Sequence, residues 1–162
     1  MDKHREPYDW LRAPVDTTPE ELCKCEKLSA ITLQAHLAFN PLVCLACNSE
    51  IHPSRVSLNA EQAEIIYNWH GLYESLYLLW LDSGEYEKWA KERLSDPDGE
   101  VNVRGRNICE TLSEKVPAYY WWFHDSCGHE ILPITVCPVC KAPTIKGYGG
   151  NICEKCRVIV NG

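Results

Sequence analysis

Two closely spaced cysteine pairs near the C-terminus constrain the fold of this chain more than any other feature. Two residues separate Cys137 from Cys140 and Cys153 from Cys156, and twelve residues lie between the pairs. Each pair predicts a tight turn, and two such turns present four thiolates to one tetrahedral ion, which zinc accepts at about 2.3 Å. Iron in the same cage is the main alternative. The spacing therefore predicts a four-cysteine zinc ribbon over residues 137–162, whose metal is structural because no coordination position is left open.

A third pair, Cys44 and Cys47, has the same spacing but needs two further ligands to hold a metal. Two complements stand elsewhere in the sequence: Cys23 with Cys25 upstream, and Cys127 with His129 downstream. Without either complement, the pair is a knuckle that has lost its metal, or two thiols packed as small hydrophobic side chains. The sequence leaves these alternatives open, so a second zinc ion is a hypothesis.

The compartment decides how such cysteine clusters are interpreted, because structural disulfides are rare in a reducing cytoplasm. Residues 1–7 have no apolar stretch typical of a secretory signal. No apolar run approaches the roughly 18 residues of a membrane span. We therefore expect a cytoplasmic protein that does not bind a membrane, in which clustered cysteines hold metal.

Hydrophobic periodicity predicts the helices. Apolar residues recur at spacings of three and four from Ile65 to Trp80, which is typical of a long core helix. Asn59 and Gln62 form a capping box at its start. Further helices are expected over about 86–95 and 103–115, and the second of them carries Cys109 as a buried thiol. Thr18 and Glu21 form another capping box, which predicts a short helix.

Three segments have the pattern of strands. Apolar and polar residues alternate over 31–39, residues 118–123 are almost all aromatic, and 131–136 is β-branched and apolar. The fold class is therefore α+β, with a helical layer (59–115) on a small antiparallel sheet and the ribbon at the end. We divide the chain into an irregular arm with a short helix (1–30), an α+β core (31–136) and the ribbon (137–162).

The aromatic run 119–123 has two interpretations. Such a run could stack the bases of single-stranded nucleic acid, but stacking platforms usually have Lys or Arg beside them. Here Glu110 and Glu114 precede the run and Asp125 follows it. We therefore favour a sheet core beneath the long helix, with both faces of the strand covered.

Charge is distributed unevenly. The chain carries −7 at pH 7, which argues against broad binding to a nucleic-acid backbone. Four cations remain in the ribbon as candidates for a local nucleic-acid contact: Lys141, Lys146, Lys155 and Arg157. One Zn²⁺ with four thiolates leaves the ribbon at only about +1. The acidic remainder is a plausible face for a basic protein partner.

Motifs of the common enzyme classes are missing from the sequence: HExxH, GxSxG, a P-loop and GxGxxG. Cys127 with His124 and His129 could be drawn as a nucleophile with a base, but such groups normally meet through the fold and not along the chain. We therefore expect no catalytic residues and a protein that is not an enzyme.

Three segments between residues 31 and 162 together resemble an uncharacterised bacterial family described as zinc-ribbon-containing, with a suggested role in nucleic-acid binding. They are Asn40-Pro41 before the Cys44 and Cys47 pair, Gly105-Arg106 leading to Val116-Pro117-Ala118-Tyr119-Tyr120, and the terminal ribbon. The resemblance implies zinc at Cys137, Cys140, Cys153 and Cys156. Lys141 departs from the glycine that often follows the second cysteine of a ribbon knuckle.

These observations favour a non-enzymatic zinc-binding protein that acts as a protein-interaction module, either an adaptor or an inhibitor of the immunity or antitoxin kind. That last comparison is an analogy with small acidic bacterial proteins. The alternative is a nucleic-acid-binding zinc-ribbon protein.

Overall fold

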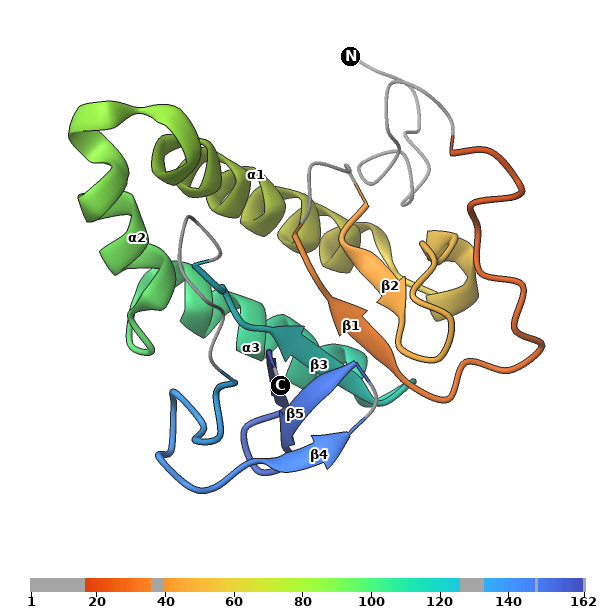
Figure 1. Ribbon diagram of the computed structural model, residues 1–162. Coiled ribbons are helices and arrows are strands. Elements are labelled where there is room, and N and C mark those ends of the chain that lie inside the picture. Colours follow the sequence, from red (N-terminus) through yellow and green to blue (C-terminus); the bar gives the residue numbers. More distant parts are fainter. Residues whose placement is uncertain (1–16, 36–39, 126–132, 148, 162) are drawn as a thin grey trace, which may run out of the picture.

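The computed structural model describes residues 17–35, 40–125, 133–147 and 149–161. The protein has the α+β fold that the hydrophobic pattern predicts, with three α-helices on one side of a six-stranded sheet (Figure 1). In chain order the elements are β1 (Ile31–Leu33), β2 (Leu42–Cys44), the 3₁₀ turn η2 (Pro53–Val56), α1 (Ala60–Asp82), the 3₁₀ turn η3 (Gly84–Tyr86), α2 (Glu87–Ser95), α3 (Glu100–Leu112), β3 (Ala118–Trp121), β4 (Ile145–Gly147), β5 (Gly150–Cys153) and β6 (Val158–Val160).

The six strands form one mixed sheet in the order β2-β1-β3-β6-β5-β4. β1 pairs in parallel with β3, and β3 pairs in parallel with β6, while the other neighbours are antiparallel. The parallel pairs correct the expectation of an antiparallel sheet. Parallel neighbours need a connection of a dozen or more residues. Between β1 and β3 the chain passes through β2 and the helices, and between β3 and β6 it passes through β4 and β5. The β3–β6 pair makes the ribbon strands part of the same sheet as β1–β3. The domain boundaries predicted after residues 30 and 136 stay predictions.

Helix α1 begins where the capping box predicts. Asn59 Oδ1 accepts a hydrogen bond from the Gln62 amide at 2.7 Å, and Gln62 Oε1 accepts one from the Asn59 amide at 3.1 Å. The helix continues through Gly71 for 23 residues. Helix α3 begins at Glu100, three residues earlier than expected, because Gly99 serves as its N-cap directly after the preceding turn. None of the described helices is both long and apolar enough to span a bilayer.

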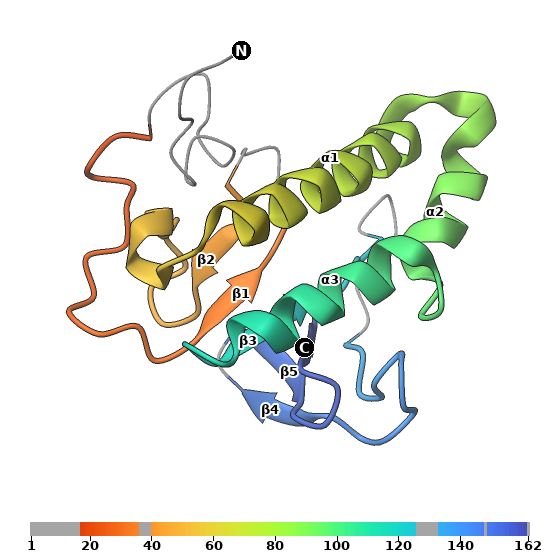
Figure 2. The same ribbon diagram turned by 180° about the vertical axis from the view of Figure 1, so that it is seen from behind.

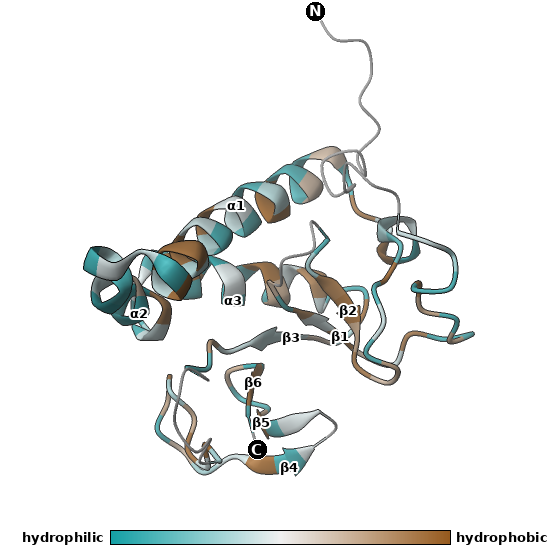
Figure 3. Cartoon of the chain, turned by 45° about the horizontal axis from the view of Figure 1, so that its top comes forward, coloured by the Kyte–Doolittle hydropathy of each residue, from teal (hydrophilic) through white to brown (hydrophobic). Residues whose placement is uncertain are grey.

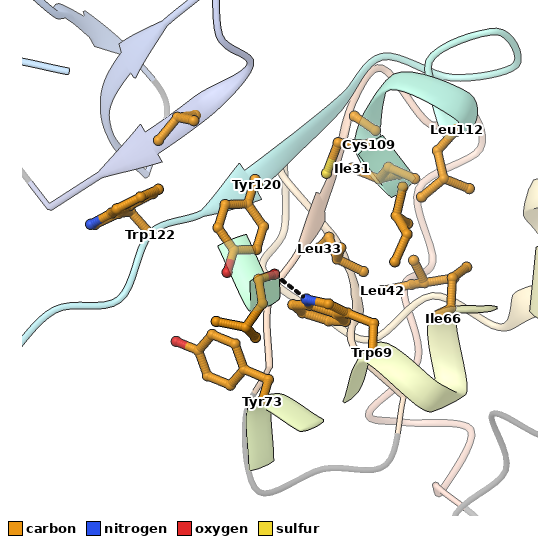
Figure 4. Close-up of a cluster of buried hydrophobic side chains, with 14 of the residues drawn as sticks. Ile31, Leu33, Leu42, Ile66, Trp69, Tyr73, Cys109, Leu112, Tyr120 and Trp122 are labelled. Carbon is orange, nitrogen blue, oxygen red and sulfur yellow. Dashed lines mark hydrogen bonds between the residues drawn. The ribbon is translucent and has the colours of Figure 1, made fainter. Parts of the chain in front are cut away.

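The helices pack on the sheet through aromatic side chains (Figure 4). Trp69 of α1 is 1% exposed, and its indole N–H donates to the Val101 carbonyl of α3 at 2.9 Å. Its ring meets Tyr120 of β3 edge-on, with centroids 5.9 Å apart, and Trp80 meets Phe123 in the same way at 5.0 Å. The aromatic run therefore does lie beneath the long helix.

The two faces of this strand are covered unequally. Side chains alternate between the two faces of a strand, so Tyr119 and Trp121 point away from the helices on which Tyr120 packs. Both are half-buried, whereas Tyr120 is fully buried. The three helices lie on one side of the sheet when the molecule is seen from behind (Figure 2) or tilted (Figure 3). The helical layer therefore covers one face of β3 only.

Two local predictions differ from the structure. The Glu21 carboxylate does accept hydrogen bonds from the Thr18 amide and hydroxyl, both at 3.0 Å, but the capping box closes a turn and not a helix. The chain instead enters a bridge between Leu22 and Glu50. In the strand predicted over 131–136, residues 131–132 lie outside the described part, and the rest forms only an isolated bridge at Val136. Residues 1–16 and 36–39 also lie outside it.

Candidate metal centres

The four ribbon cysteines come together in the folded chain. The sulfur atoms of Cys137, Cys140, Cys153 and Cys156 all lie within 4.8 Å of one another, and those of Cys140 and Cys153 are 3.6 Å apart. Four sulfurs at about 2.3 Å from one tetrahedral zinc are separated by about 3.8 Å, whereas a disulfide brings two sulfurs to about 2.05 Å. The spacing of these thiols therefore suits zinc or a similar metal. We call these four residues the C-terminal cluster.

A second set of four thiols has the same geometry. The sulfurs of Cys23, Cys25, Cys44 and Cys47 also lie within 4.8 Å of one another. The structure thus selects the upstream complement of the orphan pair, and we call these residues the N-terminal cluster. Cys127, the downstream candidate, lies outside the described residues. Four thiols complete a tetrahedral set without it.

Contacts distant in sequence hold the N-terminal cluster in place. The Cys23 amide donates to the Glu50 carbonyl at 2.7 Å, which ties the upstream segment to the chain after β2. The Arg55 guanidinium donates to the carbonyls of Cys23 and Cys25, at 2.9 and 2.5 Å. Arg55 therefore fixes the backbone that presents both upstream thiols. Because Arg55 lies 30 or more positions along the chain from these cysteines, spacing alone could not reveal the contact.

The three Cys-x-x-Cys turns share one backbone feature. The residue after each second cysteine has a positive φ: 56° at Asn48, 62° at Lys141 and 51° at Arg157. In two of the turns its amide donates back to the carbonyl of the first cysteine, at 2.8 Å from Asn48 and 3.0 Å from Lys141. Lys141 thus adopts the left-handed conformation that glycine would adopt more easily. The Cys44 and Cys47 turn has the same form as the two ribbon turns, which favours a metal knuckle over a pair of buried thiols.

One thiol of each cluster is unusually acidic. Burial raises the pKa of Cys47, but hydrogen bonds from the side chain and amide of Ser49, together with those from Cys23 and Cys44, outweigh burial and lower the pKa to about 7. The Ala142 amide likewise lowers the pKa of Cys140 to about 7, against a smaller effect of burial. Each of these cysteines is the second of its turn. Since the thiolate is the form that binds a metal, the two turns prepare equivalent ligands.

Another thiol of each cluster has the opposite tendency. Hydrogen bonds with the thiols of Cys47 and Cys23 raise the pKa of Cys25 to about 12. Burial, followed by a hydrogen bond with Cys140, raises the pKa of Cys156 to about 12. Four thiols packed this closely cannot all ionise without a cation between them. Metal binding and loss of the thiol protons are therefore coupled in both clusters.

The four candidate nucleic-acid contacts all lie exposed on the ribbon: Lys141, Lys146, Lys155 and Arg157. The Lys141 ammonium donates to the Pro138 carbonyl at 2.6 Å, within its own turn. Glu154 lies between two of the cations in sequence, and its carboxylate accepts a hydrogen bond from the Tyr119 hydroxyl at 2.9 Å. The cations are therefore available to solvent, next to an acidic group that faces the sheet.

Cys109, the cysteine of helix α3, belongs to neither cluster. Cys109 is fully buried in α3, as expected of a packed thiol, and burial raises its pKa strongly. The nucleophile-and-base arrangement considered for Cys127 with His124 and His129 stays untested, because Cys127 and His129 lie outside the described residues.

Comparison with known families identifies the central part of the chain. A family model described as "Domain of unknown function (DUF2310)" matches residues 27–123, which is more than half of the sequence. The chain belongs to this family. The comparisons with curated proteins and with solved structures give no match.

The extent of the DUF2310 match relates directly to the two clusters. Residues 27–123 include Cys44 and Cys47 but end before the C-terminal cluster, and they begin after Cys23 and Cys25. The DUF2310 model itself names no zinc ribbon. The resemblance to a zinc-ribbon-containing family therefore rests on the cysteine geometry of this protein.

Proposed function

We propose that this DUF2310 protein is a non-enzymatic protein-interaction module, an adaptor or inhibitor, whose sheet is held at both ends by structural zinc. Each cluster supplies four thiol ligands, so a bound zinc would have no open position for water or substrate. The N-terminal cluster lies at the β2 end of the sheet and the C-terminal cluster at the β5–β6 turn. Zinc there would supply folding energy to segments with few helical contacts.

The observation that carries the proposal is the distribution of exposed apolar side chains. Six of the eight large exposed hydrophobic residues among the described residues belong to α1, η3 and α2: Ile65, Tyr67, Leu78, Leu81, Tyr86 and Trp89. Leu78 is 50% exposed and Trp89 is 49% exposed. Isolated exposed hydrophobic residues are ordinary, but a concentration on one helical layer is typical of an interaction surface.

Charge on α1, the longest helix of this layer, indicates the chemistry of the partner. Helix α1 carries four acidic residues and no Lys or Arg. A cavity of about 380 Å³ lies between α1 and α3; half of its ten lining residues are apolar, the exposed Ile65 among them, and Arg104 is its one charged residue. An acidic surface with apolar anchors is complementary to a basic protein segment that carries apolar side chains of its own. We therefore infer a basic protein partner for the helical layer.

A photo-reactive amino acid at position 89, with the same substitution at exposed Ile145 of β4 as a matched control, tests this function. In an extract of the source cells, we expect position 89 to crosslink one basic protein in stoichiometric amount. The crosslink should weaken at high salt and with Leu81→Lys. A zinc-loaded monomer that crosslinks no protein from position 89, or the same proteins from both positions, would contradict the proposal.

A further inference from the structure

The face of the sheet opposite the helices contains a second cavity. It measures about 310 Å³ and lies between the N-terminal knuckle, at Cys47 and Asn48, and the β4–β5 turn, at Gly149. Thr32, Gln34 and Trp121 form its floor on the sheet. A Cβ added at Gly149 would lie 3.9 Å from Cζ3 of Trp121, so the turn approaches the indole ring at that atom. The cavity therefore lies between the N-terminal knuckle and the tip of the β4–β5 hairpin, on the face that the helices leave free.

The chemistry of the cavity disfavours an ionic ligand and favours a planar one. Its described lining contains no Lys, Arg, Asp or Glu, and its one ionisable group is the Cys47 thiol of the N-terminal cluster, so an anionic group would gain no favourable contact inside it. Tyr120 packs toward the helices, so its neighbour Trp121 lies on the opposite face of the strand. Trp121 is half-buried, so part of its flat aromatic surface stays open to a ligand. Aromatic surfaces of this kind attract flat rings by stacking.

One polar group of the lining lacks a partner. Gln34 is only 9% exposed, and its Oε1 atom is buried without a hydrogen bond in the described part of the chain. An unsatisfied buried carbonyl destabilises a folded protein, so its presence calls for a donor supplied from elsewhere. A ligand that enters this cavity can supply an N–H donor to the Gln34 amide, whose planar group rotates to present its oxygen.

We propose that this cavity binds one unpaired nucleobase, with its ring against Trp121 and an N–H group of its edge donating to Gln34. Every nucleobase combines a flat face with N–H donors on its edge. A volume of 310 Å³ lies at the lower end of the range of about 300–1,000 Å³ that small-ligand sites have, which suits a single base. The base comes from a free nucleoside or from a single strand. The site is on the opposite face from the proposed protein surface and does not depend on it.

Calorimetric titration of the zinc-loaded full chain tests the site, with the four nucleosides as one set of probes and short single-stranded homo-oligonucleotides as the other. We expect at least one base to bind, and Trp121→Leu to weaken it by about tenfold or more, since stacking on an aromatic ring dominates such contacts. Trp89→Leu, at an exposed tryptophan of α2, is the matched control and should leave binding unchanged.

Gln34→Met separates binding from folding. It replaces the unpartnered carbonyl by an apolar group of similar shape, so the unfolding midpoint should stay the same or rise while base affinity falls about tenfold. Gln62→Met on α1 is the contrasting control: its carbonyl is hydrogen-bonded in the capping box, so the unfolding midpoint should fall while base affinity stays the same. Binding to nucleosides identifies the base alone as the ligand, and binding only to oligonucleotides identifies a single strand, provided that Gln34→Met and Trp121→Leu weaken it. No binding of any probe at millimolar concentration, or binding that both variants retain, overturns the proposal.

Discussion

Gly105 shows at the scale of a single residue how closely α3 approaches the sheet. A Cβ at this position would lie 2.4 Å from Cε2 of the Tyr120 ring, which is itself fully buried. The Tyr120 hydroxyl donates to Asn102 Oδ1 at 2.8 Å, one turn earlier on the same helix. The ring is therefore held at both ends and cannot move aside easily. Glycine at 105 is a requirement of packing and not of backbone conformation.

Replacing Gly105 by alanine should destabilise the protein by about 1–3 kcal/mol, because the added methyl group overpacks a rigid aromatic contact. Urea unfolding followed by near-UV circular dichroism measures the change. Gly71→Ala in α1 is the matched control, since an added Cβ there meets nothing within 4 Å. That variant should be more stable by about 0.5–1 kcal/mol, because alanine favours the helix interior. Equal effects at the two positions would contradict this account of the α3–β3 contact.

The Cys-x-x-Cys turn is the recurring element of this protein. Its three copies end with a non-glycine residue in the left-handed conformation. Such a residue normally carries a steric cost, which the metal-bound turn must overcome. The element therefore contains strain that a single substitution can relieve.

We expect Lys141→Gly to stabilise the zinc-loaded protein by about 1 kcal/mol, because glycine adopts a φ of 62° without the steric cost of a Cβ. Lys141→Val should have the opposite effect and weaken zinc retention against a chelator. Both are measured by thermal unfolding and by the rate of zinc transfer to a coloured chelator. Lys146→Gly in β4, where φ is not positive, removes the same charge and should not stabilise. A stabilisation by both glycine variants would trace the effect to charge.

At the scale of the whole molecule, two clusters hold opposite ends of one sheet, and each should bind its own metal. Elemental analysis of the purified chain should give about two zinc ions per molecule. Cys44→Ser should lose one ion and Cys153→Ser the other, while Cys109→Ala should retain both because that thiol belongs to neither cluster. Iron in either site would be recognised by its colour. One zinc ion in the native chain and in Cys44→Ser alike would show that the N-terminal cluster holds none.

Zinc binding should also release protons in a pH-dependent way. Cys47 and Cys140 have pKa values lowered to about 7, so these thiols are mostly protonated at pH 6 and mostly thiolates at pH 8. The number of protons released on zinc binding should therefore fall by about one per cluster over this range. Titration of the metal-free chain in buffers of different ionisation enthalpy measures this number.

Ser49→Ala should shift the contribution of the N-terminal cluster to higher pH, because Cys47 loses a hydrogen-bond donor. Unchanged release between pH 6 and 8 would contradict the assignment.

The local patterns of the sequence were sufficient to predict several elements. The capping box at Asn59 marks the start of α1. The alternation over 31–39 locates β1, but the described strand covers Ile31–Leu33 only and is buried on both faces, not half-buried. The ribbon cysteines are brought together as their spacing predicts. These features depend on neighbours within a few positions, so each can be recognised without the rest of the chain. The capping box at Thr18 shows the limit, because the bridge between Leu22 and Glu50 redirects the chain before a helix can form.

The sequence by itself determined the α+β class, the long core helix and the four-thiol ribbon, because periodicity and cysteine spacing are local quantities. Only the tertiary structure decided which cysteines complete the orphan pair, since the contacts of Arg55 and Glu50 that position Cys23 and Cys25 connect distant segments. It also decided the parallel strand pairs and the face on which Trp121 lies. Strand order and the cover of each sheet face result from how the helices pack, which no single segment of the chain encodes.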